Sequence, residues 1–155
     1  MPKLPVVENK KLVLTNVICY ELRNISYDLL DTKINQFIHK LKVLNVNSFG
    51  PLITKAFGTN INPTGELMIN YDIMVQVHNY VNYKDMFKTY DRLVVENCVY
   101  VRFDDHPQYM NFAHNKLDLY FYEQDLISSD ITYTVIVEEN NNNLVMDLFK
   151  PVKTL

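Results

Sequence analysis

In two places the hydrophobic pattern of this chain changes from the period of a strand to the period of a helix. Each time strands follow, and this repeated order limits the folds that the chain can adopt. In residues 11–24 apolar side chains alternate with others, which is typical of a half-buried strand. In residues 26–44 they recur every three or four positions, which predicts one face of a helix. Two further strands are predicted at residues 51–57 and 67–78.

The second half of the chain repeats this order after a polar connector, residues 79–90, in which we expect one helical turn. A strand is predicted at residues 92–103. A helix is predicted from Asp105-His106-Pro107 to about residue 126, because proline suits a first helical turn. The helix residues predicted to be buried against the sheets are Phe37 and Leu41 on the first helix and Leu117 and Phe121 on the second. Two strands, 131–137 and 144–152, complete the repeat.

Matching residues accompany the repeated order. Cys19-x-x-Leu22-Arg23 in the first half corresponds to Cys98-x-x-Val101-Arg102 in the second, with one spacing between the cysteines and between the arginines. An internal duplication is therefore predicted. The expected fold is α+β, one domain over residues 1–155, with two pseudo-symmetric strand–helix–strand–strand halves at 11–79 and 92–152.

Charge and composition exclude several classes of protein. The formal net charge is −3, and Lys10-Lys11 is the only adjacent basic pair, which argues against nucleic-acid binding. No apolar run suits a signal peptide or a membrane span. Two cysteines in 155 residues do not form a disulfide framework. We therefore expect a cytoplasmic protein.

No pattern in the sequence predicts catalysis or a metal. The four histidines lack a paired ligand spacing, the two cysteines are isolated, and no nucleophile or phosphate-binding motif is present. No catalytic residue, metal ligand or cofactor is predicted. The 11 Tyr and 8 Phe are compatible either with a strand-rich fold or with a ligand-binding surface.

The candidate site is the strand face opposite the main apolar face. Two interpretations remain open: a pocket with charged and aromatic anchors, or cross-strand ion pairs on a solvated sheet, such as Glu21 with Arg102. The residues predicted to share this face are Glu21, Arg23, Asp72, Tyr100, Arg102 and Thr134.

Several segments together resemble the gyrase-inhibitor-like, or effector-binding, domain that occurs alone and at the carboxyl end of many bacterial transcription regulators. They are Val17–Arg23 before the first helix, Gly50-Pro51, Tyr71–Val77, Val94–Phe103 before the second helix, and the closing Met146–Val152. The resemblance implies antiparallel sheets with helices on one side and, on the other, a groove that holds small, often cationic or aromatic, molecules.

The chain departs from the family at one important position. Drug-sensing members carry a buried glutamate after the second helix and a tyrosine two residues later, where this chain aligns Thr134 and Ile136. A neutral threonine cannot pair with a buried cation. The predicted ligand is therefore neutral or anionic and aromatic, with Arg23 and Arg102 as anchors and Tyr100 as a stacking surface.

Three functions remain open. A non-enzymatic small-molecule binding domain comes first, and direct transcriptional regulation is not expected because no DNA-reading segment is present. The alternative is a protein-interaction or accessory module, for example of a secretion or toxin system, with a protein partner or a homodimer bound through Phe112, Leu119 and Tyr122. Hydrolysis through Asp72 or Glu21 is the third.

Overall fold

The computed structural model describes residues 4–153, which divide into two compact units. The first unit is Leu14–Arg92, and the second comprises the residues up to Val13 together with those from Leu93 onward. The strands are β1 (Val7–Ser26), β2 (Ser48–Ile61), β3 (Leu67–Val77), β4 (Lys88–Asp105), β5 (Ile131–Glu139) and β6 (Leu144–Pro151). The helices are α1 (Leu30–Val43) and α2 (Asn111–Glu123), with short 3-10 turns η1 (Tyr27–Leu29), η2 (Tyr80–Tyr83) and η3 (Pro107–Tyr109). The fold is thus α+β, as predicted.

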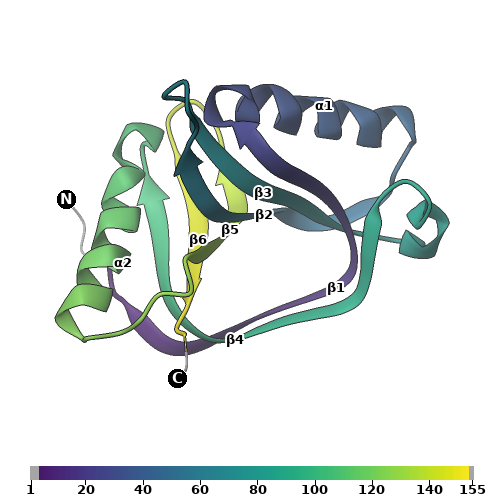
Figure 1. Ribbon diagram of the computed structural model, residues 1–155. Coiled ribbons are helices and arrows are strands. Elements are labelled where there is room, and N and C mark those ends of the chain that lie inside the picture. Colours follow the sequence, from purple (N-terminus) through teal and green to yellow (C-terminus); the bar gives the residue numbers. More distant parts are fainter. Residues whose placement is uncertain (1–3, 154–155) are drawn as a thin grey trace. The chain divides into compact units, whose positions relative to one another are not determined.

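In the first unit, β3 lies between β1 and β2, and both pairings are antiparallel. Helix α1 lies across one face of these strands (Figure 1). The core between them contains Ile18 from β1, Ile73 and Val75 from β3, and Phe37 from α1, which is 1% exposed.

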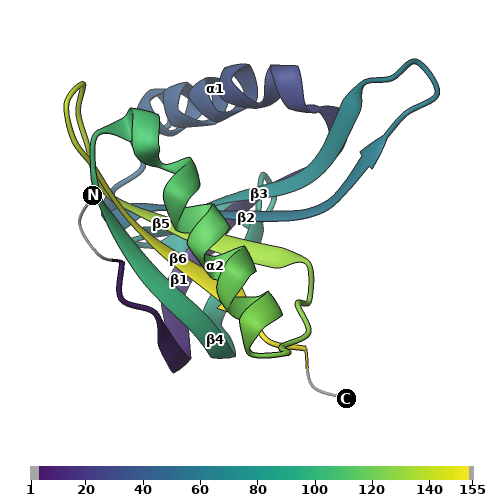
Figure 2. The same cartoon turned by 90° about the vertical axis from the view of Figure 1, so that its left-hand side faces the viewer.

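In the second unit, β6 lies between β4 and β5, again in antiparallel pairing. Helix α2 runs along these strands (Figure 2). Its Leu117 and Phe121 pack with Val101, Phe103 and Leu148, and the N-terminal residues Leu4 and Val6 pack against the same cluster. The predicted burial of Phe37, Leu117 and Phe121 is confirmed, and Leu41 is half-buried against the first core.

Both helices end in the same motif. Asn45 and Asp125 have left-handed backbones, with φ of 53° in each case. The amide of the next residue then bonds back to the carbonyl five residues earlier, Val46 to Leu41 and Leu126 to Phe121. This is the Schellman C-cap, in which the two bonded residues also form a hydrophobic contact. It ends α2 at Glu123, three residues before the predicted end.

The start of each helix also differs in detail from expectation. Ser26 precedes a 3-10 turn rather than α1 itself, and its side chain makes no capping bond. His106 does cap the second helical segment, since its ring nitrogen accepts from the Gln108 amide at 3.2 Å. Strands β1 and β4 are longer than predicted, at 20 and 18 residues.

The burial of strand β3 does not alternate from residue to residue, as it would in a strand with one exposed face. The four consecutive residues Asp72, Ile73, Met74 and Val75 are all buried. Both faces of the first unit's sheet therefore exclude water at its centre. No helix within residues 4–153 has the length and apolar character needed to cross a membrane.

Candidate functional site

The face of each sheet that turns away from its helix carries most of the predicted site. Residues directly opposite each other on paired strands point to the same face. In the first unit Glu21 lies opposite Asp72, which lies opposite Lys55 on β2. Their neighbours Ile18, Leu22 and Ile73 belong to the core under α1, so this charged row lies on the other side of the sheet.

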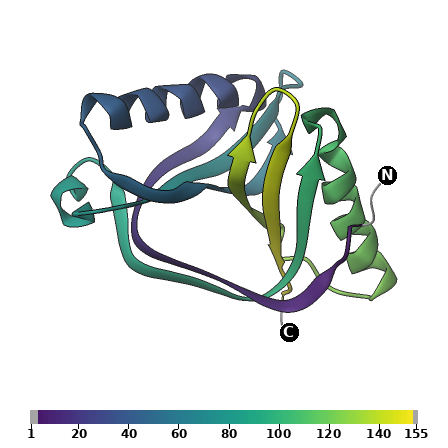
Figure 3. The same ribbon diagram turned by 180° about the vertical axis from the view of Figure 1, so that it is seen from behind.

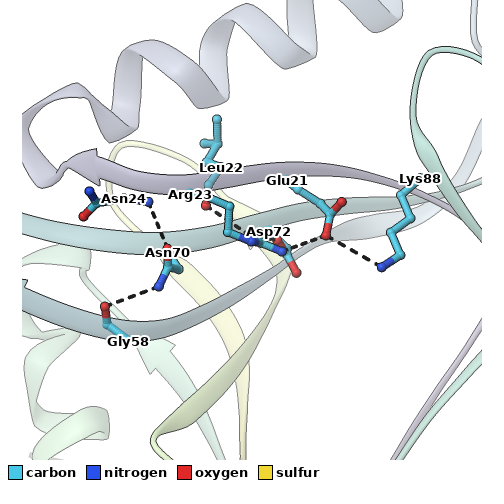
Figure 4. A network of polar contacts seen from close by, with 8 residues as sticks. All are labelled: Glu21, Leu22, Arg23, Asn24, Gly58, Asn70, Asp72 and Lys88. Carbon is cyan, nitrogen blue, oxygen red and sulfur yellow. Dashed lines mark hydrogen bonds and ion pairs between the residues drawn. The ribbon is translucent and has the colours of Figure 1, made fainter.

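Arg23 holds the two carboxylates of this row together (Figure 4). Its Nη1 lies 2.5 Å from Asp72 Oδ1, and its Nη2 lies 2.7 Å from Glu21 Oε2. Lys88 Nζ approaches the same Glu21 oxygen at 3.8 Å. The guanidinium also lies 4.9 Å from the centre of the Phe57 ring, a cation–π contact. Without these cations, the directly opposed carboxylates would repel each other.

Two irregularities in the strands set the position of Arg23. The β1–β3 register shifts between Leu22 and Ile25, and the β2–β3 register shifts between Phe57 and Asn60. Asn70 on the central strand joins both bulges: its Oδ1 accepts from the Asn24 amide at 2.9 Å, and its Nδ2 donates to the Gly58 carbonyl at 3.5 Å (Figure 4). Gly58 has φ of +66°, and a Cβ there would lie 2.6 Å from Asn70 Nδ2.

The electrostatics of this cluster favour ion pairs over reactivity. Burial alone would lower the pKa of Arg23, but the hydrogen bond and charge of Asp72 outweigh it and raise the pKa. Burial, reinforced by Asp72 and Glu21, raises the pKa of the Cys19 thiol to about 12. Cys19 is therefore a neutral, buried thiol near neutral pH and a poor nucleophile.

The second unit places a different trio on its helix-free face. Asp147 Oδ1 accepts from the Tyr100 hydroxyl at 2.7 Å and from Arg102 Nε at 2.7 Å, and Oδ2 accepts from Arg102 Nη2 at 3.0 Å. The Tyr100 ring lies 5.0 Å from that of Phe149, and Lys10 Nζ lies 5.3 Å from its centre. This is a two-pronged arginine–carboxylate pair beside stacked aromatic rings.

Asp147 is the charged centre of that trio. Its partial burial would raise its pKa, but the hydrogen bonds from Arg102 and Tyr100 outweigh this and hold the pKa below its usual value. Burial, together with the hydrogen bond to Asp147, raises the pKa of Tyr100. The bonds to Asp147 also raise the pKa of Arg102. The trio is therefore carboxylate, phenol and guanidinium at neutral pH.

Thr134 does not lie on this face, so its predicted placement is wrong. It pairs with Leu148, which pairs with Val101, and both of these belong to the core under α2. Tyr133, opposite Phe149, and Val135, opposite Asp147, occupy the face that carries Tyr100 and Arg102. The argument against a cationic ligand therefore cannot rest on Thr134.

The ion pairing also differs from the Glu21–Arg102 pair considered from the sequence. Glu21 pairs with Arg23, and Arg102 pairs with Asp147. Sequence reasoning missed Asp147, although a lone aspartate between Met146 and Leu148 in an apolar strand is a recognisable signal. In the part of the chain described, no cluster of three or more His, Cys, Asp or Glu could hold a metal.

The residues predicted to face a protein partner are exposed. Phe112, Leu119 and Tyr122 on α2 have exposed fractions of 49%, 52% and 82%. The Phe112 ring also lies 5.9 Å from that of Tyr109. All three lie on the side of α2 that does not enter the core, and together they are called the exposed strip of α2.

Comparison with known proteins gives matches in structure alone. No protein-family model matches the sequence, and no curated protein does. The structure of SAV2435 bound to tetraphenylphosphonium matches at 11% identity over 98% of this chain and 94% of that one, with a TM-score of 0.55.

Two other solved structures match over similar lengths. The C-terminal domain of EcmrR matches at 8% identity and a TM-score of 0.66, over 99% of this chain and 98% of that one. A hydrolase encoded by lin2189 from Listeria innocua matches at 9% identity and a TM-score of 0.52, over 97% and 92%. At such identities the likeness concerns the fold, and the fold of this chain is that of the gyrase-inhibitor-like domains which its sequence resembles.

Proposed function

We propose that this chain is a non-enzymatic domain that binds a small aromatic molecule, neutral or anionic, as an effector. The observation that carries small-molecule binding is the likeness, over nearly the whole chain, to a structure that holds tetraphenylphosphonium. It supports an aromatic ligand but not the charge of that ligand, since tetraphenylphosphonium is a cation. We assign the contact to the helix-free face of the second unit, where Tyr100, Tyr133 and Phe149 lie beside Arg102. Flat aromatic side chains with a few polar anchors are typical of small-molecule sites.

The charge of the ligand follows from the pairing of Asp147. This carboxylate already accepts three hydrogen bonds from Tyr100 and Arg102, so a cation would have to compete with Arg102 for it. Arg102 keeps a side chain that is 53% exposed, and Lys10 adds a second positive charge over Tyr100. An anionic or neutral aromatic molecule therefore fits this face better than a cation.

A thermal-shift experiment tests this proposal with three flat or aromatic probes: naphthalene-2-carboxylate, naphthalene-2-methanol and tetraphenylphosphonium. We expect the carboxylate to raise Tm most, since only the folded state binds it. The effect should disappear in Tyr100→Ala and persist in Tyr122→Ala, a tyrosine on α2. Stabilisation by tetraphenylphosphonium that survives Arg102→Gln would contradict both the polarity and the residue assignment.

A protein-interaction module is the second candidate. The exposed strip of Phe112, Leu119 and Tyr122 supports it, because contiguous apolar surface often marks a partner site. This function would take the lead if none of the three probes changed Tm and if a triple Phe112→Ser, Leu119→Ser and Tyr122→Ser variant lost self-association or a co-purifying partner.

Hydrolysis has the weakest support. Glu21 and Asp72, the carboxylates considered for it, both pair with Arg23. The guanidinium, rather than a substrate, therefore occupies both carboxylates.

A further inference from the structure

A small cavity lies on the α1 side of the first unit, away from the charged row of Glu21 and Asp72. Tyr20 lies opposite Ile73, a residue of the core under α1, so Tyr20 lies on the helix-covered face. Figures 1 and 3 show the C-terminal half of α1 and the η2 turn at the same end of this unit. The cavity measures about 210 Å³ and is lined by Tyr20, Gln36, Phe37, Lys40, Met86 and Phe87.

Three aromatic rings form its walls. The rings of Tyr20 and Phe37 are 5.5 Å apart, those of Phe37 and Phe87 also 5.5 Å, and those of Tyr20 and Phe87 6.5 Å. Phe37 and Phe87 are 1% and 7% exposed, so packing holds them in place. Edge and face contacts of this kind favour another aromatic ring as the occupant.

The volume of the cavity limits the size of that occupant. An apolar cavity of roughly 150 Å³ is enough to hold benzene. At about 210 Å³ this one has room for a single six-membered ring with a short substituent. A larger polycyclic molecule would have to extend past Met86 into solvent.

Apart from the hydroxyl of Tyr20, the polar side-chain groups at the cavity come from α1. Gln36 and Lys40 are four residues apart and therefore lie on one side of the helix, one turn from each other. Lys40 Nζ lies 5.2 Å from the centre of the Phe87 ring, and Lys40 is exposed. The six lining residues include no carboxylate, so the polar groups that a substituent would meet are an ammonium, an amide and the Tyr20 hydroxyl.

We propose that this cavity binds a small aromatic carboxylate. The ring packs against the cluster of Tyr20, Phe37 and Phe87, and the carboxylate accepts hydrogen bonds from Lys40 and Gln36. This goes beyond the proposed effector binding, because the cavity lies on the helix-covered face of the first unit's sheet, whereas the effector face belongs to the second unit and shares none of the lining residues. A matching amine is excluded by repulsion from Lys40.

Methionine methyl signals provide a local test. The chain has six Met, and Met86, which lines the cavity, is 52% exposed. Protein labelled with carbon-13 in its methionine methyl groups is titrated with phenylacetate, 2-phenylethanol and 2-phenylethylamine, and Met86→Leu assigns the signal. We expect phenylacetate to shift the Met86 methyl signal and to bind about tenfold more tightly than 2-phenylethanol. The amine should bind most weakly of the three.

Matched variants test whether Lys40 binds the carboxylate. Lys40→Met should weaken the binding of phenylacetate about tenfold and leave the affinity for 2-phenylethanol within about twofold, since a charged hydrogen bond is lost and the apolar walls remain. Lys42→Met, two residues further along the same helix, should change neither. Tyr100→Ala should also change neither, which separates this site from the proposed effector face. Unchanged signals of the buried Met74 and Met146 verify that each variant is folded.

Three results would overturn the inference. One is a Met86 signal that does not shift at roughly 20 mM phenylacetate, because a site that is still unoccupied at this concentration does not bind phenylacetate specifically. Another is equal affinity for phenylacetate and 2-phenylethanol. The third is phenylacetate binding that survives Lys40→Met but not Tyr100→Ala, which would assign the ligand to the effector face instead.

Discussion

Replacing Arg102 by Met removes the partner of Asp147 and keeps the length of the side chain. Arg102 donates two hydrogen bonds to Asp147, at 2.7 and 3.0 Å, and the Asp147 side chain is 13% exposed. Removing one partner of a buried ion pair costs about 3–5 kcal/mol. Because Arg102 is itself 53% exposed and Tyr100 still donates to Asp147, we expect about 2–3 kcal/mol here.

The complementary change should cost less. In Asp147→Asn the half-exposed Arg102 is left to water and the amide oxygen can still accept, so we expect a loss of about 1 kcal/mol. The double variant should resemble Asp147→Asn, giving a coupling free energy of about 2–3 kcal/mol. Urea unfolding followed by circular dichroism measures these values, since the chain has no Trp to report by fluorescence.

The pH dependence of the free energy of unfolding separates the contribution of the Asp147 charge from that of packing. Arg102 and Tyr100 hold the folded-state pKa of Asp147 below its ordinary 3.8, so the stability that this carboxylate contributes is present above that value. It is lost as the pH falls through the folded pKa. In Arg102→Met the part of this lowering that comes from Arg102 is absent, so the difference from wild type should shrink below about pH 4. A difference that stays constant from pH 7 to pH 3.5 would refute the ion-pair explanation and indicate lost packing instead.

Three further predictions concern the rest of the fold. Gly58→Ala should destabilise by about 1–3 kcal/mol, because the left-handed backbone and the nearby Asn70 amide leave no room for a Cβ; an unchanged urea midpoint would contradict this. Phe37→Ala and Phe121→Ala should each cost about 3–5 kcal/mol in the same assay, through lost burial and a cavity. Burial raises the pKa of Cys19 to about 12 and that of Cys98 to about 11. Above about pH 9 the thiols ionise in the unfolded chain but stay neutral in the folded one, so the free energy of unfolding should fall as the pH rises further. Both should resist a thiol reagent at pH 8 until urea is added, and fast labelling of the native protein would show that the burial is wrong.

The duplication of the two halves remains a prediction. Each unit orders its elements as strand, helix, strand, strand, and each helix ends in a Schellman motif closed by Asn45 or Asp125. An experimental structure should superpose residues 11–79 on 92–152 with Cys19 on Cys98 and Arg23 on Arg102. Cysteines several residues out of register would argue against a common origin.

The sequence by itself determined the number, order and type of the elements. The change from a period of two to a period of 3.6 is a property of local geometry, so each strand and helix could be located from its own residues. The same pattern identified Phe37, Leu117 and Phe121 as core residues. It also placed Glu21, Arg23, Asp72, Tyr100 and Arg102 on faces away from the helices, since each of their strands has one clearly apolar side.

Tertiary structure decided which side chains meet. In strand β5, Ile131, Tyr133, Val135 and Val137 alternate with Thr132, Thr134 and Ile136, so its own pattern would turn Thr134 away from the core. Pairing with β6 decides otherwise and turns Thr134 towards α2. The partners of the arginines depend on register and on bulges. Asn70 fixes two bulges by bonds to residues 46 and 12 positions away, and Asp147 meets Arg102 across 45 residues. A local hydrophobic period carries no information about such distant contacts, because they depend on how paired strands are aligned.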